Sequence, residues 1–198
     1  PIRGGLDARR WPLDNHGKSL YWVGLNKGKR SIAIDTRKPE GQEIVTALIT
    51  APGPGNGIFL TNFPASGWLG YETLKKRRND LIMLNLFGSP DGSSAVDYTV
   101  NCAVGIPFST GPAHSDATHP VNHALPAWDA ITGVTSALGI VTAERHRRLT
   151  GEGQFIKIAL SDVAMAMVGN LGYIAEAELM HEDRPAFGNY LYGAYGRD

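Results

Sequence analysis

The chain has 198 residues, 42% of them apolar and 19% charged, and its 19 basic and 19 acidic side chains leave no net charge at pH 7. Such a composition is sufficient for a compact core and differs from that of disordered chains, which are poor in apolar residues. Zero net charge argues against a broad nucleic-acid-binding surface. No segment reaches the ~18 consecutive apolar residues that a membrane helix needs. We therefore expect a globular, cytoplasmic protein.

Cysteine and histidine usage bears on metal binding. The single cysteine, Cys102, excludes an internal disulfide and a cysteine-based zinc site. One loop-rich stretch contains several candidate ligands, namely His114, Asp116, His119, His123 and Asp129. Their spacing matches no familiar ligand pattern, and there is no His-Glu-x-x-His motif. We therefore expect no metal.

The two ends suggest a piece of a longer protein. The sequence opens on Pro1 rather than Met, and it shows no signal-peptide pattern. It closes on residues 195–198 without a terminal helix. We expect a chain that is truncated at both ends.

In the first half, residues 1–20 are polar and irregular, and 31–35 form a short β-like run. A helix is predicted from Pro39, because apolar residues then recur on one helical face. The cluster Gly-Pro-Gly-Asn-Gly at 53–57 predicts a tight turn. It precedes a strand, whereas a dinucleotide-binding glycine motif opens a helix, so no phosphate loop is expected here.

The remaining elements alternate between strands and helices. The predicted strands are 57–62, 80–87 and 154–160; the predicted helices are 71–78, 128–149 (ended by Gly151) and 163–179; and 88–127 is a long loop. Continuous apolar strands that alternate with helices indicate a parallel sheet. The fold class is therefore α/β, with a mostly parallel, Rossmann-like sheet and helices on both faces.

Asp162 stands where an apolar strand ends and a helix begins. Ligands bind at this edge of open α/β sheets, and the positive end of the helix dipole favours a carboxylate there. An ordinary N-cap is the alternative, since Asp and Ser are preferred caps. Ser161 is an equally good cap, which would leave Asp162 free for chemistry.

Basic residues gather in four places. Those at 75–78 and 145–148 close predicted helices and are expected to be solvated helix ends. Those at 9–10 and 27–30 lie in irregular chain, where they suit a compact polyphosphate better than DNA.

Several longer motifs occur in a fixed order. They are Asn-Lys-Gly-Lys-Arg-Ser-Ile-Ala-Ile-Asp at 26–35, Thr-Asn-Phe-Pro at 61–64, Leu-Gly-Tyr-Glu at 69–72, Thr-Gly-Glu-Gly-Gln at 150–154 and Leu-Ser-Asp at 160–162. Through these motifs the whole chain resembles the family III CoA-transferases, the formyl-CoA and carnitine CoA-transferase group. The resemblance implies that residues 1–198 are the N-terminal portion of the large Rossmann-like domain. It further implies that the small domain lies later in the chain and that the protein is an interlocked homodimer.

The resemblance also implies roles for individual residues. The family's nucleophilic aspartate follows the strand after Gly-x-Gly-Gln, which in this chain is Asp162, and its carboxylate forms an aspartyl-CoA thioester. Arg10 matches an arginine that reaches the nucleotide phosphates of CoA, and Asn62 and Phe63 match the pair that lines the CoA channel. Coenzyme A is then part of the substrate, and no permanently bound cofactor is expected. Many members have Asn-Phe-Arg-Pro-Gly where residues 62–66 read Asn-Phe-Pro-Ala-Ser, so that arginine is missing.

Further phrases, at 24–30, 125–129 and 188–198, resemble the branch of the family that moves CoA between the two carboxyls of mesaconate, a methyl-branched C4 diacid. The resemblance therefore implies intramolecular CoA transfer. One alternative is an intermolecular acyl-CoA:carboxylate CoA-transferase. Another is an α-methylacyl-CoA racemase, although residues 128–133 lack the histidine expected for it and only His123 is near. A third is a non-catalytic relative that binds CoA or a partner chain.

Overall fold

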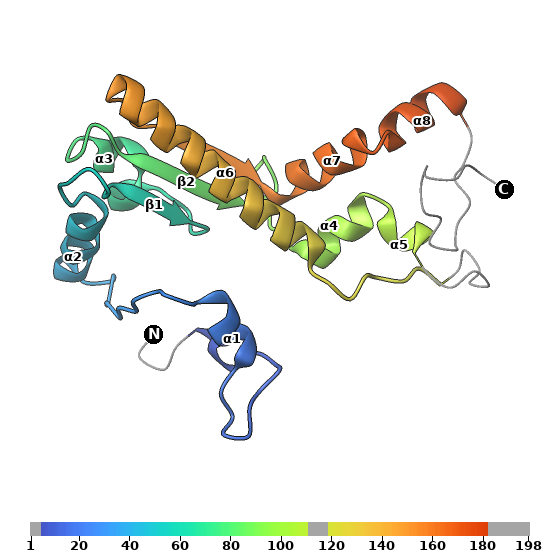
Figure 1. The fold of residues 1–198 in the computed structure, drawn as a ribbon, viewed down its shortest axis with the longest axis horizontal. Coiled ribbons are helices and arrows are strands. Elements are labelled where there is room, and N and C mark those ends of the chain that lie inside the picture. The colour runs from blue at the N-terminus through green and yellow to red at the C-terminus, as the bar shows by residue number, and fades with distance from the viewer. Residues whose placement is uncertain (1–4, 111–118, 182–198) are drawn as a thin grey trace. The chain divides into compact units, whose positions relative to one another are not determined.

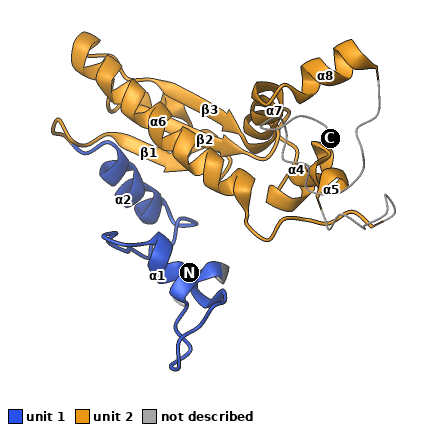
Figure 2. Cartoon of the chain, turned by 45° about the vertical axis from the view of Figure 1, so that its right-hand side comes forward, with its two compact units in different colours: residues 1–51 blue, residues 52–198 orange. Residues whose placement is uncertain are grey.

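The computed structural model describes residues 5–110 and 119–181, and its contacts divide the chain into two compact units, Pro1–Ala51 and Pro52–Asp198 (Figure 2). The strands all belong to the second unit. No helix among the described residues is long and apolar enough to cross a membrane. That residues 1–198 fall within one large domain remains a prediction.

The first unit contains a short 3-10 helix, η1 (Leu6–Arg9), and two α-helices, α1 (Leu20–Leu25) and α2 (Pro39–Ile49). The buried Ser19 begins α1, because its hydroxyl accepts a hydrogen bond of 3.0 Å from the Trp22 N–H. The predicted helix after residue 38 is confirmed, with Pro39 in its first turn. The prediction of a β-like run at 31–35 is wrong, because this segment pairs with no described strand and its Ile32 is exposed.

The second unit is built on a parallel sheet of three strands, β1 (Ile58–Thr61), β2 (Ile82–Phe87) and β3 (Phe155–Ala159), in the order β1-β2-β3. In register, Asn85 of β2 lies between Thr61 of β1 and Lys157 of β3. The central strand is buried from its start, whereas both outer strands are partly exposed. The predicted strands are confirmed, and burial on both faces explains why every residue of β2 except Asn85 is apolar.

Helices cover both faces of the sheet. The 24-residue α6 (Ala127–Thr150) crosses one face, where a Cβ placed on Gly139 would lie 3.8–3.9 Å from the side chains of Leu84 and Ile156 (Figure 1). Successive strand residues point to opposite faces, so Phe155 faces the other way. There its ring stacks on Tyr71 of α3 (Tyr71–Lys75) at a centroid distance of 5.0 Å.

The remaining helices correct two predictions. The expected loop 88–127 contains α4 (Asp97–Ala103) and α5 (Ile106–Ser109). Earlier in the chain, a 3-10 helix, η2 (Gly67–Leu69), precedes α3. The expected single helix 163–179 is two helices, α7 (Leu160–Asn170) and α8 (Tyr173–Met180). Gly172 separates them because its φ of 84° is a left-handed conformation that ends a helix.

A small core anchors the start of α7. Val100 of α4, Trp128 of α6 and Leu160, Ala164 and Val168 of α7 form one buried cluster. Three helices therefore fix the residues that directly follow β3.

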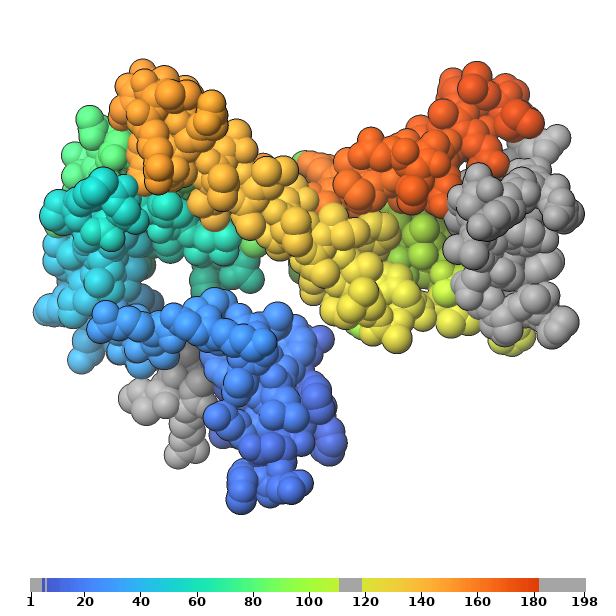
Figure 3. Space-filling view, in the orientation of Figure 1, coloured from blue at the N-terminus to red at the C-terminus, as the bar shows by residue number. Residues whose placement is uncertain are grey.

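The opposite face of α6 remains exposed. Val134, Leu138 and Val141 are 73%, 66% and 64% exposed, and the helix lies along the surface of the second unit (Figure 3). Their spacing of four and three residues places them in one apolar stripe.

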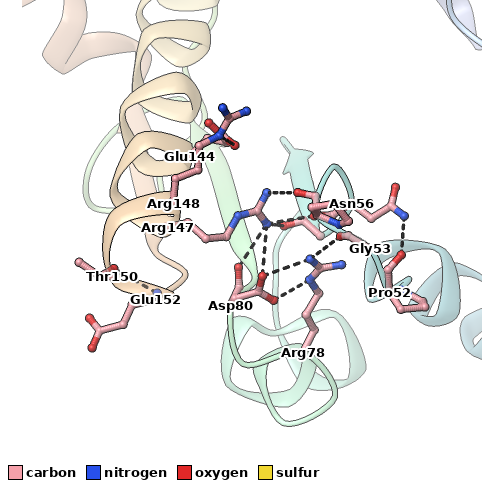
Figure 4. Close-up of polar contacts among 12 residues, drawn as sticks. Pro52, Gly53, Asn56, Arg78, Asp80, Glu144, Arg147, Arg148, Thr150 and Glu152 are labelled. Atoms are coloured by element: carbon pink, nitrogen blue, oxygen red, sulfur yellow. Dashed lines mark hydrogen bonds and ion pairs between the residues drawn. The ribbon is translucent and has the colours of Figure 1, made fainter.

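At the amino-terminal edge of the sheet, two buried arginines join the ends of distant segments (Figure 4). Arg147, at the end of α6, donates hydrogen bonds to the carbonyls of Asn56 (3.0 Å), Gly57 (3.2 Å), Asp80 (3.3 Å) and Pro54 (3.4 Å). Arg78 donates to the Asp80 carboxylate at 2.8 and 3.2 Å. The prediction that both basic clusters are solvated is therefore wrong for Arg78 and Arg147.

These contacts also determine the charge state of Asp80. The hydrogen bonds from Arg78 hold the pKa of the Asp80 carboxyl below its usual value, and the charges of Arg78 and Arg147 add to this effect. Asp80 is therefore the counter-ion of a buried arginine pair. The turn at 53–57 is confirmed, because its carbonyls accept bonds from both arginines and Gly53 has a φ of 112°.

Candidate active site

All three parallel strands end at the other edge of the sheet, and a cleft of about 670 Å³ opens there. Its walls come from the segment after β1, the end of β2, the loop 92–95, the first turns of α6 and the start of α7. The lining residues are Asn62, Phe63, Pro64, Leu86, Phe87, Gly88, Gly92, Ser93, Ser94, Ala95, Asp129, Thr132, Gly133 and Leu160. The cleft therefore occupies the position where open α/β sheets bind ligands.

Asn62 and Phe63, the predicted CoA-channel pair, both line this cleft. The segment is held from the neighbouring strand: Nδ2 of the buried Asn85 donates to the carbonyls of Thr61 at 3.0 Å and Phe63 at 3.1 Å. The Thr61 hydroxyl also accepts a 3.1 Å hydrogen bond from the Phe63 N–H. With its backbone fixed in this way, the 70% exposed Phe63 adds an apolar surface to the cleft.

The α6 wall is positioned by a buried carboxylate from another helix. Pro126 precedes α6 and provides no side-chain cap, but Oδ2 of Asp97 accepts a 3.0 Å hydrogen bond from the Asp129 N–H. Trp128, in the same turn, donates its indole N–H to Asn101 at 3.0 Å. Both partners belong to α4, so this helix fixes the register of the α6 residues that face the cleft.

Asp162 lies in the first turn of α7, two residues after the cleft-lining Leu160. The cap position is Ala159, so neither Asp162 nor Ser161 is the N-cap, and that alternative is wrong. The Ser161 N–H donates to the Gly88 carbonyl at 3.1 Å, which ties the start of α7 to the end of β2. Asp162 is exposed, and its carboxylate has no hydrogen-bond or ion-pair partner in the described part of the chain. Both of its oxygens are therefore available for reaction.

Arg10 belongs to the first unit. Its guanidinium lies 4.5 Å from the centre of the Tyr21 ring, donates to the Tyr21 hydroxyl at 3.4 Å, and pairs with Asp7 at 3.5 Å. The Arg10 side chain is 46% exposed, so the ion pair contributes little stability. Tyr21 and Asp7 orient an accessible guanidinium, the group that best matches a phosphate.

The charge of the cleft is informative. Among its described lining residues, Asp129 is the only charged one, and there is no lysine, arginine or histidine. The polar groups are otherwise neutral amides and hydroxyls, beside the apolar Phe63, Leu86 and Phe87. Such a lining suits an uncharged, partly apolar ligand segment rather than a phosphate.

Two residues that position the site were not singled out from the sequence. Asn85 interrupts the apolar run of β2, and a buried amide in such a strand is a signal, because it must find hydrogen-bond partners. Asp97 offered no comparable signal. Its role depends on a contact with residue 129, which lies in another helix.

Comparison with known proteins agrees with this geometry. The model of CoA-transferase family III matches residues 2–196. The chain belongs to this family. A 2-methylfumaryl-CoA isomerase from Chloroflexus aurantiacus is 63% identical over an alignment of 199 positions, which covers 100% of this chain and 48% of that protein. A formyl-CoA:oxalate CoA-transferase from Afipia carboxidovorans is 33% identical, covering 80% of this chain and 38% of the relative.

A solved structure has a similar fold. A crystal structure of a CAIB/BAIF family protein from Brucella suis has a TM-score of 0.77 and 27% identity, and the match covers 93% of this chain and 50% of that one. The chain thus spans about half the length of the relatives it matches.

The histidines were the candidates for metal binding and for racemase chemistry. No group of three or more His, Cys, Asp or Glu side chains suited to a metal ion occurs among the described residues, and His114 and Asp116 lie outside them. His123 does not line the cleft. Both of its ring nitrogens are buried, and the ring lies 6.4 Å from that of Trp128. No observation therefore favours the α-methylacyl-CoA racemase among the family's activities.

Proposed function

We propose that the intact protein transfers CoA between the two carboxyls of mesaconate, converting 2-methylfumaryl-CoA into 3-methylfumaryl-CoA. The observation that carries this proposal is the 63% identity to a 2-methylfumaryl-CoA isomerase across the whole chain. The accessible Asp162 carboxylate at the ligand-binding edge of the sheet supplies the chemistry.

The proposed reaction uses Asp162 as a covalent catalyst. One carboxylate oxygen attacks the thioester carbonyl, the C–S bond breaks, and CoA leaves as a thiolate from a mixed anhydride. The thiolate attacks the aspartyl carbonyl of that anhydride, which releases the mesaconate carboxylate and leaves an aspartyl-CoA thioester. The other mesaconate carboxylate then repeats the sequence in reverse and regenerates Asp162. No net proton or electron is consumed.

Intramolecular transfer requires that mesaconate stays bound between the two halves of the reaction. Its second carboxylate then reacts within the same complex. The effective concentration of a well-oriented group in such a complex reaches ~10⁵ M in favourable cases. Free acids in solution cannot compete with this advantage. An isomerase therefore excludes exchange with added acid, whereas an intermolecular CoA-transferase depends on it.

The decisive experiment adds ¹³C-labelled free mesaconate to the intact protein while it turns over unlabelled 2-methylfumaryl-CoA. Mass spectrometry of the CoA esters is expected to show the isomerised product without label. Rapid appearance of label in the esters would identify an intermolecular CoA-transferase. Absence of any transfer would identify a non-catalytic relative.

For coenzyme A, we propose that Arg10 holds a phosphate of the nucleotide and that Asn62 and Phe63 line the channel that takes the pantetheine arm. Arg10→Ala is expected to raise KM for the acyl-CoA about tenfold and to change kcat less than twofold, because the contact is equal in ground and transition states. Steady-state kinetics checks this, with Arg9→Ala as the neighbouring control. A loss confined to kcat would instead place Arg10 at the reacting centre.

We also propose that the intact protein is an interlocked homodimer of the cytoplasm, with no permanently bound cofactor. The exposed apolar stripe of α6, formed by Val134, Leu138 and Val141, supports the association because such a surface gains free energy on burial.

A further inference from the structure

One hydroxyl of α6 differs from the others. Four side chains of this helix donate to the carbonyl four residues earlier, at 2.7–2.9 Å; they are Thr135, Ser136, Thr142 and Thr150. Thr132 is only 4% exposed, yet its Oγ1 is buried and has no hydrogen-bond partner in the described residues. A buried hydroxyl without a partner is costly, and buried polar groups in native proteins nearly always have one. Thr132 therefore needs an explanation that its own helix does not supply.

The position of Thr132 points to a ligand. It lines the 670 Å³ cleft one turn after Asp129, and Asn62 and Phe63 line the same cleft from the segment after β1. Threonine in a helix populates two χ1 rotamers, so a single rotation redirects its hydroxyl. A ligand that fills the cleft can thus provide the hydrogen-bond acceptor that the Thr132 hydroxyl lacks among the described residues.

The lining identifies the part of the ligand that fits. Acyl-CoA has a charged nucleotide end, an uncharged pantetheine arm with two amides, and an acyl group that is charged in a diacid. The described cleft residues offer no cation to a phosphate or free carboxylate, and Asp129 repels both. The pantetheine arm matches instead, because its methylenes suit Phe63 and Leu86 and its amide oxygens accept hydrogen bonds.

We propose that Oγ1 of Thr132 donates a hydrogen bond to an amide carbonyl oxygen of the pantetheine arm bound in this cleft. The inference rests on the proposed function only in taking CoA as the ligand. Thr132 is then a binding residue that holds the arm and leaves the chemical step to other groups.

The test compares Thr132→Val, which replaces the hydroxyl by a methyl of similar size, with Thr132→Ser, which keeps a hydroxyl. Calorimetric titration of the intact protein with free CoA is expected to give a three- to tenfold weaker Kd for Thr132→Val and a change below twofold for Thr132→Ser. Thr135→Val is the matched control, because it removes a hydroxyl of α6 that is already bonded and does not line the cleft. It is expected to leave the Kd unchanged.

Thermal unfolding without ligand separates binding from a structural role. Thr132→Val removes an unpaired buried hydroxyl, so its Tm is expected to equal or exceed that of the wild type. A lower Tm would overturn the proposal by showing that the hydroxyl has a partner within the protein. An unchanged Kd of Thr132→Val for free CoA would also overturn the proposal. This holds even if the variant binds the acyl-CoA more weakly, because the contact would then involve the acyl group. Titration needs no turnover, so weaker CoA binding by Thr132→Val supports the proposal even in a protein that transfers nothing.

Discussion

Asp162→Ala is expected to lower kcat for CoA transfer by roughly four orders of magnitude or more, the loss typical when a covalent nucleophile is removed. Without the carboxylate, neither the mixed anhydride nor the aspartyl-CoA thioester forms. The Kd for CoA is expected to stay within twofold. The stability is expected to change by less than ~0.5 kcal/mol, because the exposed side chain has no partner in the described residues.

Ser161→Ala is the matched control, since it alters the preceding residue of the same helical turn and is expected to keep most of the activity. Intact-mass spectrometry after acid quenching adds a direct readout: the wild type incubated with acyl-CoA is expected to carry a covalent CoA adduct that Asp162→Ala lacks. If Asp162→Ala kept a tenth of the wild-type rate, the nucleophile would have to be another residue.

The strands and long helices were predictable because their signals are local. β2 is an apolar run with Asn85 as its one polar residue, and α6 combines a long apolar periodicity with Gly151, which ends it at a φ of 78°. The helices α4 and α5 are different, with seven and four residues. One or two turns give no measurable periodicity, and α4 is stabilised by tertiary burial of Asp97, Val100 and Asn101.

The site was partly predictable for the same reason. The place of Asp162 follows from a strand that leads into a helix, a pattern that is read within a few residues. The unpaired hydroxyl of Thr132 carries no local signal, because its neighbours Thr135 and Ser136 are bonded and only the structure separates them. Local sequence signals therefore locate the edge of the sheet where the candidate site lies, and they miss residues whose positions depend on distant partners.

Arg147 shows this limit most clearly. A basic residue in the last turn of a helix is normally solvated, but this side chain is only 6% exposed. Its partners include the Asn56 carbonyl, 91 residues earlier in the sequence, and the Asp80 carbonyl. A guanidinium presents five donors in a fixed fork, so one side chain can satisfy several carbonyls of a turn at once.

Arg147→Met is expected to destabilise the intact protein by about 3 kcal/mol, since it keeps the side-chain length but removes a buried donor from four carbonyls, of which that of Gly57 keeps its bond from the Ile82 N–H. It also removes a positive charge 3.9 Å from the Asp80 carboxylate. Urea denaturation followed by circular dichroism measures the effect. Arg148→Met is the matched control, because Arg148 is 77% exposed and pairs only with Glu144 on the surface in the described chain. That variant is expected to change the stability by ~0.5 kcal/mol or less.

Arg147→Lys distinguishes the contribution of the positive charge from that of the several hydrogen bonds that the guanidinium donates. Lysine restores the positive charge near Asp80, but its compact ammonium cannot reach all four carbonyls that Arg147 bonds, those of Pro54, Asn56, Gly57 and Asp80. Its stability is expected to lie between those of Arg147→Met and the wild type. Equal stability of Arg147→Lys and the wild type would mean that charge alone matters and that the carbonyl bonds contribute nothing. Equal stability of Arg147→Met and Arg148→Met would mean that the buried arginine does not hold the edge of the sheet together.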